Sequence, residues 1–123
     1  METVIECGHE LPLNASVTTS TGGLLGIGDT NTYCDVTATS AVVFLPECMA
    51  AAGKVYLIYL SATAGGHTLQ IVPHYSIEVP ISILDGGSVV PLATGFTLTA
   101  VEDYVQLYST GYNWVVMSKK VTV

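Results

Sequence analysis

The segment from residue 96 to residue 117, FTLTAVEDYVQLYSTGYNWVVM, constrains the fold most strongly. Its three runs of β-branched and aromatic residues are separated by an acidic turn at Glu102-Asp103 and by a second turn at Thr110-Gly111. Such residues favour strands, and such turns join strands that lie next to each other. The pattern therefore predicts an antiparallel three-stranded meander in an all-β protein.

The chain before this segment follows the same rhythm of short strands and turns. Strands are predicted at residues 33–38, 41–45, 54–61, 67–72, 81–84 and 88–92. The Gly65-Gly66 pair predicts a hairpin between the third and fourth of these strands, and residues 85–87 predict another between the last two. Strands that recur about every 8–12 residues are typical of sandwiches and barrels. We expect a single antiparallel β-sandwich or jelly-roll-like domain over residues 33–123.

Two segments interrupt this rhythm. Residues 47–52, ECMAAA, are the only helix-like piece, and they predict one turn that Gly53 closes as a C-terminal cap residue. Pro73 and Pro80 bracket the sequence HYSIEV. Because proline cannot donate a hydrogen bond to a β-ladder, we expect this segment to be an edge strand or a loop.

Residues 1–32 differ from the rest of the chain. They combine acidic residues, a Thr/Ser tract and several glycines, with possible strands only at residues 3–6 and 15–19. Glycine weakens any fixed element, so residues 22–31 are expected to be a loop or an extended arm. We interpret residues 1–32 as an extended N-terminal arm that orders against a neighbouring molecule.

The composition favours an oligomer. The chain has 123 residues, which indicates one domain, and 50% of them are hydrophobic while only 11% are charged. A soluble monomer normally carries more charge on its surface, and burial between subunits would hide the excess apolar area. The longest apolar runs, such as residues 55–60, are too short to span a membrane as a helix. The opening Met1-Glu2-Thr3 lacks the basic and apolar regions of a signal peptide.

The charge balance excludes nucleic-acid binding. The formal net charge is −7, the only basic residues besides histidine are Lys54, Lys119 and Lys120, and arginine is absent. Binding to phosphates requires a cationic surface. The same acidity disfavours binding to an anionic membrane.

The three cysteines, Cys7, Cys34 and Cys48, do not describe a disulfide framework, because their number is odd and their spacing is wide. We interpret them as reduced thiols in a chain made in a reducing cytosol. One disulfide with one spare thiol is the alternative.

The sequence contains no recognisable catalytic or metal-binding constellation. Cys7 and His9 form one loose pair, and His67 and His74 are isolated, whereas a closed zinc site needs four ligands, usually in spaced pairs. The sequence Gly26-Ile27-Gly28 resembles the start of a dinucleotide-binding motif, but the third glycine and the following helix of that motif are missing. A Gly-x-Ser-x-Gly elbow is also absent. We expect no enzyme activity, no cofactor and no metal.

The aromatic residues near the C-terminus have two interpretations. Tyr104 and Tyr108 share one face of their strand by the period of two, and Tyr112 and Trp114 follow the Thr-Gly turn. An exposed aromatic cluster could bind a sugar or a protein. The alternative is that these side chains pack in the core beneath the meander.

Two stretches resemble a small β-module of tailed-bacteriophage virion proteins: LPECMAAAGKVYLIYL at residues 45–60 and LTAVEDYVQLYSTGYNWVVM at residues 98–117. The modules share Leu-Pro, a short Ala-rich turn, Gly-Lys and a strand, and they close with Gly-x-Asn-Trp and a final strand. The matching residues are Leu45, Pro46, Gly53, Lys54, the hairpin glycine Gly66, Gly111, Asn113 and Trp114.

Such modules occur in tail fibres, head fibres and capsid decoration (cement) proteins, where they are typically trimeric and non-enzymatic. The resemblance implies a homotrimeric decoration protein, made in the host bacterial cytoplasm, that binds the major capsid protein on the virion exterior. The chain has no shaft repeat or coiled-coil heptad, which argues against a long fibre. The alternative is a tail-fibre or head-fibre module that binds a host receptor or glycan through Tyr104, Tyr108, Tyr112 or Trp114.

Overall fold

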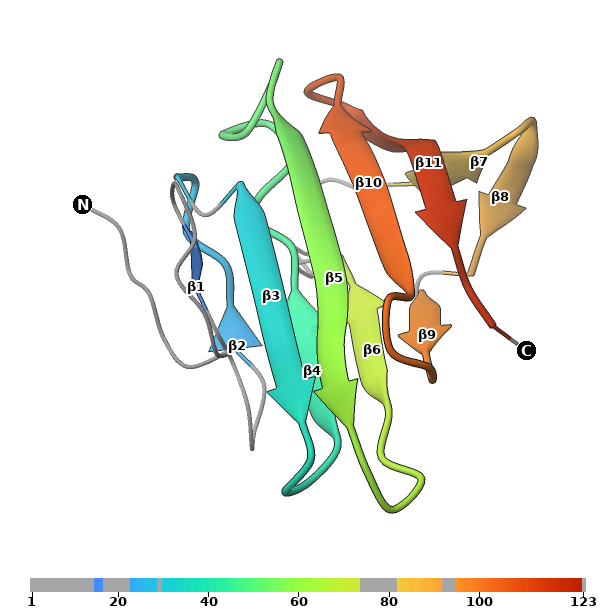
Figure 1. Ribbon diagram of the computed structural model, residues 1–123. Helices are drawn as coiled ribbons and strands as arrows, with labels where there is room; N and C mark the ends of the chain where they lie inside the picture. Colours follow the sequence, from blue (N-terminus) through green and yellow to red (C-terminus); the bar gives the residue numbers. More distant parts are fainter. Residues whose placement is uncertain (1–14, 17–22, 29, 74–81, 92–94, 123) are drawn as a thin grey trace.

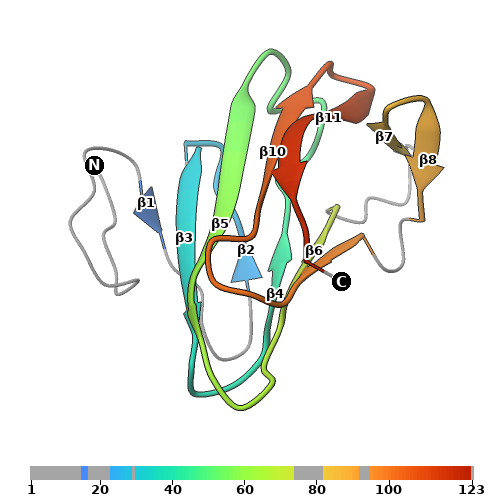
Figure 2. The same ribbon diagram turned by 45° about the vertical axis from the view of Figure 1, so that its right-hand side comes forward.

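The computed structural model describes residues 15–16, 23–28, 30–73, 82–91 and 95–122. In these residues eleven strands form two sheets, seven strands in sheet A and four in sheet B. The sheets lie face to face with a hydrophobic core between them (Figures 1 and 2). The predicted all-β, sandwich-like fold is therefore confirmed.

The predicted strands after residue 32 all have counterparts in the structure. Sheet A consists of β1 (Ala15–Ser16), β3 (Asn31–Val36), β5 (Val55–Thr63), β10 (Tyr104–Ser109), β11 (Asn113–Lys120), β7 (Ser82–Asp85) and β8 (Ser88–Val90), in that spatial order. Sheet B consists of β2 (Gly23–Leu24), β4 (Ala41–Phe44), β6 (Leu69–Val72) and β9 (Phe96–Leu98), also in spatial order.

From β1 to β6 the chain alternates between the two sheets. The odd-numbered strands β1, β3 and β5 are parallel neighbours in sheet A, and the even-numbered strands β2, β4 and β6 are parallel neighbours in sheet B. Parallel neighbours require a crossover connection, and here each crossover is a strand of the opposite sheet. The first half of the fold is therefore a flattened parallel coil (Figure 1).

The prediction of a purely antiparallel sandwich or jelly roll is wrong. Besides the coil, β7 pairs with β11 in parallel, while β5–β10, β10–β11, β7–β8 and β6–β9 are antiparallel. A jelly roll is built from antiparallel Greek keys, so these mixed sheets do not fit it. Period-two burial indicates which face of a strand points inward, but it does not specify the direction of the neighbouring strand.

The prediction of a hairpin at Gly65-Gly66 is also wrong. The strands on either side of it, β5 and β6, lie in different sheets. Both glycines have positive φ, +64° and +77°, and they turn the chain from one sheet to the other. This loop lies against the preceding crossover, because Nδ1 of His67 is 2.9 Å from the carbonyl oxygen of Val36.

The prediction of a three-stranded meander at the end of the chain is only partly correct. β10 and β11 form an antiparallel hairpin as predicted, but β9 lies in sheet B and pairs with β6. The hairpin predicted around residues 85–87 is confirmed by the antiparallel pair β7–β8. The single turn predicted at residues 47–52 is also confirmed, since the N–H of Ala51 donates to the carbonyl of Glu47 and Gly53 follows with φ +84°.

Part of the segment expected to be a loop before β3 belongs to the fold. β2 pairs with β4, and Leu25 is 3% exposed and donates its N–H to the carbonyl of Phe44. β3 already begins at Asn31, so the predicted boundary between residues 32 and 33 falls within a strand. Residues 1–14, 17–22 and 29 of the predicted arm, and the whole segment between the two prolines, lie outside the described residues.

Asp103 fixes the turn between β9 and β10 and holds the C-terminal residues against it. Its buried carboxylate accepts hydrogen bonds from the N–H groups of Thr99, Ala100 and Thr122 at 3.0–3.1 Å, and from Oγ1 of Thr122 at 2.7 Å. Burial by itself raises the pKa of Asp103, but the bonds from Thr122, Ala100 and Thr99 outweigh it. The pKa of Asp103 therefore lies below its usual value.

A carboxylate with a lowered pKa stabilises the fold above its unfolded pKa of about 3.9, and this contribution declines as the pH falls through the folded pKa. We predict that Asp103→Ala lowers the free energy of unfolding at neutral pH by about 3 kcal/mol, because three N–H groups lose their acceptor. The difference from wild type should shrink below about pH 4. Urea denaturation across this range measures both values. Asp35→Ala is the control, since the Asp35 side chain accepts its hydrogen bonds from the exposed Thr37. A loss independent of pH would contradict this account.

Among the described glycines, Gly95 has the least room for a side chain. It has φ +55°, and a Cβ atom there would lie 1.8 Å from the carbonyl oxygen of Ile71 in β6. We predict that Gly95→Ala displaces β9 from β6 and costs about 3 kcal/mol or more in the free energy of unfolding. Gly28→Ala is the matched control, because a Cβ atom on Gly28 would meet no heavy atom within 4 Å beyond its chain neighbours. Equal stability of the two variants in urea titrations would show that β9 does not pack against β6 in this way.

Candidate functional site

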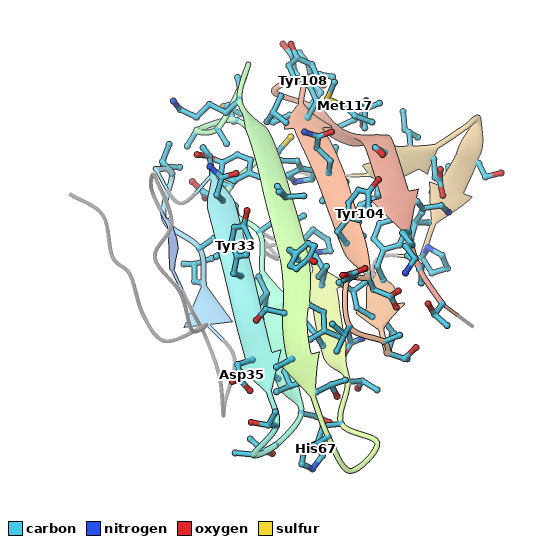
Figure 3. All side chains as sticks on the ribbon, in the orientation of Figure 1. Tyr33, Asp35, His67, Tyr104, Tyr108 and Met117 are labelled. Carbon is cyan, nitrogen blue, oxygen red and sulfur yellow. The ribbon has the colours of Figure 1, made fainter. Side chains whose placement is uncertain are left out.

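The outer face of sheet A carries a row of three tyrosines. Tyr33 on β3, Tyr59 on β5 and Tyr104 on β10 stand directly opposite one another in neighbouring strands. The alternate residues of these strands are buried, so the three side chains point away from the core. Figure 3 shows Tyr33 and Tyr104 on the face turned toward the viewer. The row spans roughly 10 Å, because neighbouring strands lie about 4.8 Å apart.

These tyrosines border a shallow hollow of about 340 Å³ on the sheet surface. Its lining residues, which define the tyrosine hollow, are Tyr33, Leu57, Tyr59, Tyr104, Gln106 and Ser118. All six lining side chains are uncharged. The hollow therefore combines aromatic and aliphatic surface with a few polar atoms, which is the usual chemistry of a ligand site.

The polar groups of the tyrosine hollow are held in place by the sheet. The hydroxyl groups of Tyr104 and Ser118 lie 2.7 Å apart, and either can donate to the other. The rings of Tyr33 and Tyr59 contact each other with centroids 5.3 Å apart at an interplanar angle of 41°. Gln106, which stands between Leu57 and Ser118 in the strand register, has no side-chain hydrogen bond within the described chain.

Tyr59 keeps its phenolic proton over the physiological pH range. Burial raises the pKa of its hydroxyl, and the nearby charge of Glu102 and the neighbouring Tyr33 raise it further. The Tyr59 hydroxyl therefore remains a hydrogen-bond donor in the lining of the tyrosine hollow.

The structure divides the binding surface predicted from the sequence. Tyr104 and Tyr108 do share the outer face of β10, but only Tyr104 lines the tyrosine hollow. Tyr108 lies opposite Val115 near the end of the hairpin, and Tyr112 is 73% exposed in the turn between β10 and β11 (Figure 3 labels Tyr108).

Sequence reasoning missed Tyr33 and Tyr59 as partners of Tyr104. The period of two does place Tyr59 on the outer face of its strand, so one part of the signal was present. The missing information was the parallel pairing of β3 with β5, which brings Tyr33 beside Tyr59. Without that pairing, the three tyrosines are scattered along the sequence.

Most residues of the motif that ends in Gly-x-Asn-Trp gather at one end of the sandwich. The N–H of Gly53 donates to the carbonyl of Ser109, the N–H of Ser109 donates to the carbonyl of Lys54, and Thr110 and Asn113 close the hairpin turn. A Cβ atom on Gly111 would lie 3.3 Å from Ala52. These contacts join the turn at residues 47–53 to the β10–β11 hairpin, whereas Gly66 lies in the loop between β5 and β6.

Ser109 and Cys48 form a buried contact that the sequence did not predict. The Ser109 hydroxyl donates to the carbonyl of Cys48 at 2.7 Å and lies 3.1 Å from its Sγ atom. Cys48 and Cys34 are both buried, and no disulfide joins them. Cys7 lies outside the described residues.

Trp114 belongs to the core and not to a surface patch. It is fully buried on β11, and its ring and the Tyr56 ring form a T-shaped pair with centroids 5.5 Å apart. The Tyr56 hydroxyl in turn donates to the carbonyl of Ile27 at 2.6 Å. The core-packing alternative is therefore correct for Trp114.

A second hollow lies beside β2 at the edge of sheet B, with a volume of about 430 Å³. Its lining residues, which define the apolar hollow, are Leu24, Leu25, Gly26, Ile27, Pro46, Glu47 and Ala50. Leu24 is 58% exposed and Ile27 is 36% exposed, and Met49, next to Ala50, is 62% exposed. Exposed apolar side chains that cluster in this way are typical of protein contact surfaces.

The described residues contain no group of three or more His, Cys, Asp and Glu side chains that could hold a metal ion. His67 is engaged with Val36, and Cys7, His9 and His74 lie outside the described residues. Glu102 and Asp103 separate as expected for adjacent positions, since Glu102 is exposed in the turn with φ +76° and Asp103 is buried.

Comparisons of the chain with protein-family models, with curated proteins and with solved structures find no match. Across the described residues, no helix has the length and apolar character that crossing a membrane requires.

The burial of Trp114 makes it a reporter of the core. We predict that acrylamide quenches its fluorescence weakly in the native protein and several times more strongly after unfolding in urea, because the ring is sealed between the sheets. Tyr112→Trp, which places a second indole at an exposed turn, should be quenched strongly in the native state. Strong native quenching of the wild-type protein would contradict the core position of Trp114.

Proposed function

We propose that this protein is a non-enzymatic virion protein that decorates the outer surface of a bacteriophage capsid and stabilises the head. It would act as a homotrimer bound to the major capsid protein. Its contribution is mechanical, because added contact area between capsomers shares the load that packaged DNA places on the shell.

The observation that carries this proposal is the apolar hollow. Leu24 and Ile27 project from the edge of sheet B beside Pro46, and they are the kind of exposed apolar cluster that protein partners cover. Among the described residues, Glu47 is the only charged one that lines it. A partner that covers this hollow therefore removes apolar surface from water and desolvates few charges.

The low charge content and the motif resemblance add to this support. A chain that is 50% hydrophobic and 11% charged gains solubility when its apolar edges are buried in an assembly. Stable assemblies of this kind bury on the order of 1,600 Å² per interface. We name the capsid as the partner because the sequence around Gly53 and Gly111 resembles the phage virion modules.

The tyrosine hollow favours a second candidate, a tail-fibre or head-fibre module that binds a host receptor. Tyrosine is enriched where proteins bind other molecules, since its ring is large and rigid and its hydroxyl is polar. The two candidates differ in the position of the protein on the particle and in the surface that it uses.

The capsid proposal predicts that a charge in the apolar hollow abolishes docking. Purified Leu24→Asp protein, added to capsids that lack the decoration protein, should bind at least about tenfold more weakly than wild type in a sedimentation assay, because the buried carboxylate has no partner. Val89→Asp is the matched control, since Val89 is 63% exposed on β8 in the other sheet.

Decorated capsids should also withstand heating better than bare capsids, and Leu24→Asp should remove this protection. Wild-type affinity of the Leu24→Asp protein for capsids would contradict the proposed docking surface. Failure of the wild-type protein to bind capsids would contradict the proposed function.

A further inference from the structure

We propose that the tyrosine hollow on sheet A binds a neutral saccharide. This inference goes beyond the capsid role, because it assigns a small-ligand site to the opposite sheet from the apolar hollow. It holds for a decoration protein and for a receptor-binding module alike.

The aromatic rings supply the first argument. The faces of tyrosine rings carry negative electrostatic potential, and the C–H groups on one side of a pyranose ring are weakly positive. Tyr33, Tyr59 and Tyr104 present such rings in a row across three neighbouring strands. The Tyr33 and Tyr59 rings contact each other with centroids 5.3 Å apart, so the two side chains form a continuous aromatic surface.

The polar atoms supply the second argument. A sugar needs donors and acceptors beside the surface on which its C–H groups pack. Gln106 offers both an amide N–H and a carbonyl oxygen, and its side chain has no hydrogen-bond partner within the described residues. The Tyr104 and Ser118 hydroxyl groups, 2.7 Å apart, offer a further donor and acceptor at the edge of the hollow.

The charge around the hollow selects a neutral ligand. The six lining residues are uncharged, and Glu102 lies close enough to Tyr59 to raise its pKa. An acidic saccharide, such as one that carries sialic acid, would meet this negative field without a cation in the lining to pair with it. Lys120, which stands opposite Tyr104 on β11, is already paired with the carboxylate of Asp103 at 3.7 Å. The formal net charge of −7 disfavours it further.

The size and rigidity of the hollow suit a short oligosaccharide. Its volume of about 340 Å³ lies at the lower end of the range for ligand sites, and the tyrosine row spans roughly 10 Å. All six lining side chains stand on β3, β5, β10 or β11, which pair with one another across the sheet. A site built on paired strands loses little conformational freedom when a ligand binds.

The test is a glycan array that displays neutral and sialylated oligosaccharides, probed with the full chain in multivalent form. We expect binding to a subset of the neutral glycans and weaker binding to their sialylated counterparts. Titration of the labelled protein with the best neutral glycan, followed by NMR, should shift the signals of the hollow, including those of Leu57 and Gln106.

Two variants test the residues of the hollow. Tyr59→Ala should weaken binding at least about tenfold, because the central ring of the platform is lost. Gln106→Leu, which keeps the size of the side chain, should weaken it by a similar factor. Tyr112→Ala is the control, since Tyr112 is exposed outside the hollow, and it should bind as wild type does.

Several results would overturn the inference. A protein that binds no neutral glycan on the array, or one whose shifted signals lie away from sheet A, has no saccharide site in the tyrosine hollow. Unchanged affinity of the Gln106→Leu and Tyr59→Ala proteins would have the same meaning. If Tyr59→Ala instead prevents capsid docking and no glycan binds, the surface is a protein interface. The Leu24→Asp experiment on capsids is independent of all these outcomes.

Discussion

The core between the two sheets is the constraint on which the rest of the structure depends. Every strand of the coil from β3 to β6 buries alternate residues against the opposite sheet, as Cys34 and Val36 of β3 and Val43 of β4 do. A two-residue strand such as β2 has no core of its own and is held by its pairing with β4 and by the burial of Leu25. Because the inward-facing side chains form the core, only the outward-facing side chains of the strands are available to contact a ligand or a partner.

The alternation of the chain between the sheets explains where the two hollows lie. Consecutive strands enter opposite sheets, so residues about two strands apart in sequence become neighbours, as Tyr33 and Tyr59 do. The tyrosine hollow forms on sheet A, where strands from the coil meet the β10–β11 hairpin. The apolar hollow forms where β2, at the edge of sheet B, meets the turn that follows β4. The two surfaces belong to different sheets, and we propose a different partner for each.

Local sequence signals predict the strands and two of the hairpins, but not the pairing between strands that are distant in the sequence. The positions of β3 to β11, the turn at residues 47–52 and the β7–β8 and β10–β11 hairpins follow from β-propensity and from turn residues such as Gly53 and Gly111. The pair Gly65-Gly66 was misinterpreted as a hairpin, because two glycines with positive φ can turn a chain within one sheet or between two sheets. Only the long-range packing distinguishes these outcomes.

The candidate site was only partly predictable, because it also depends on the long-range pairing of strands. The outward position of Tyr104 follows from the period of two along β10, but its neighbours in the site come from β3 and β5 through strand pairing.

The central claim is that this protein acts on the exterior of a capsid. Gold-labelled antibodies against the protein, imaged on intact virions that carry it, test this most directly. The account predicts label spread over the head, because a decoration protein occupies many equivalent positions on the shell. Label confined to the tail tip would contradict it and would assign the protein to host recognition.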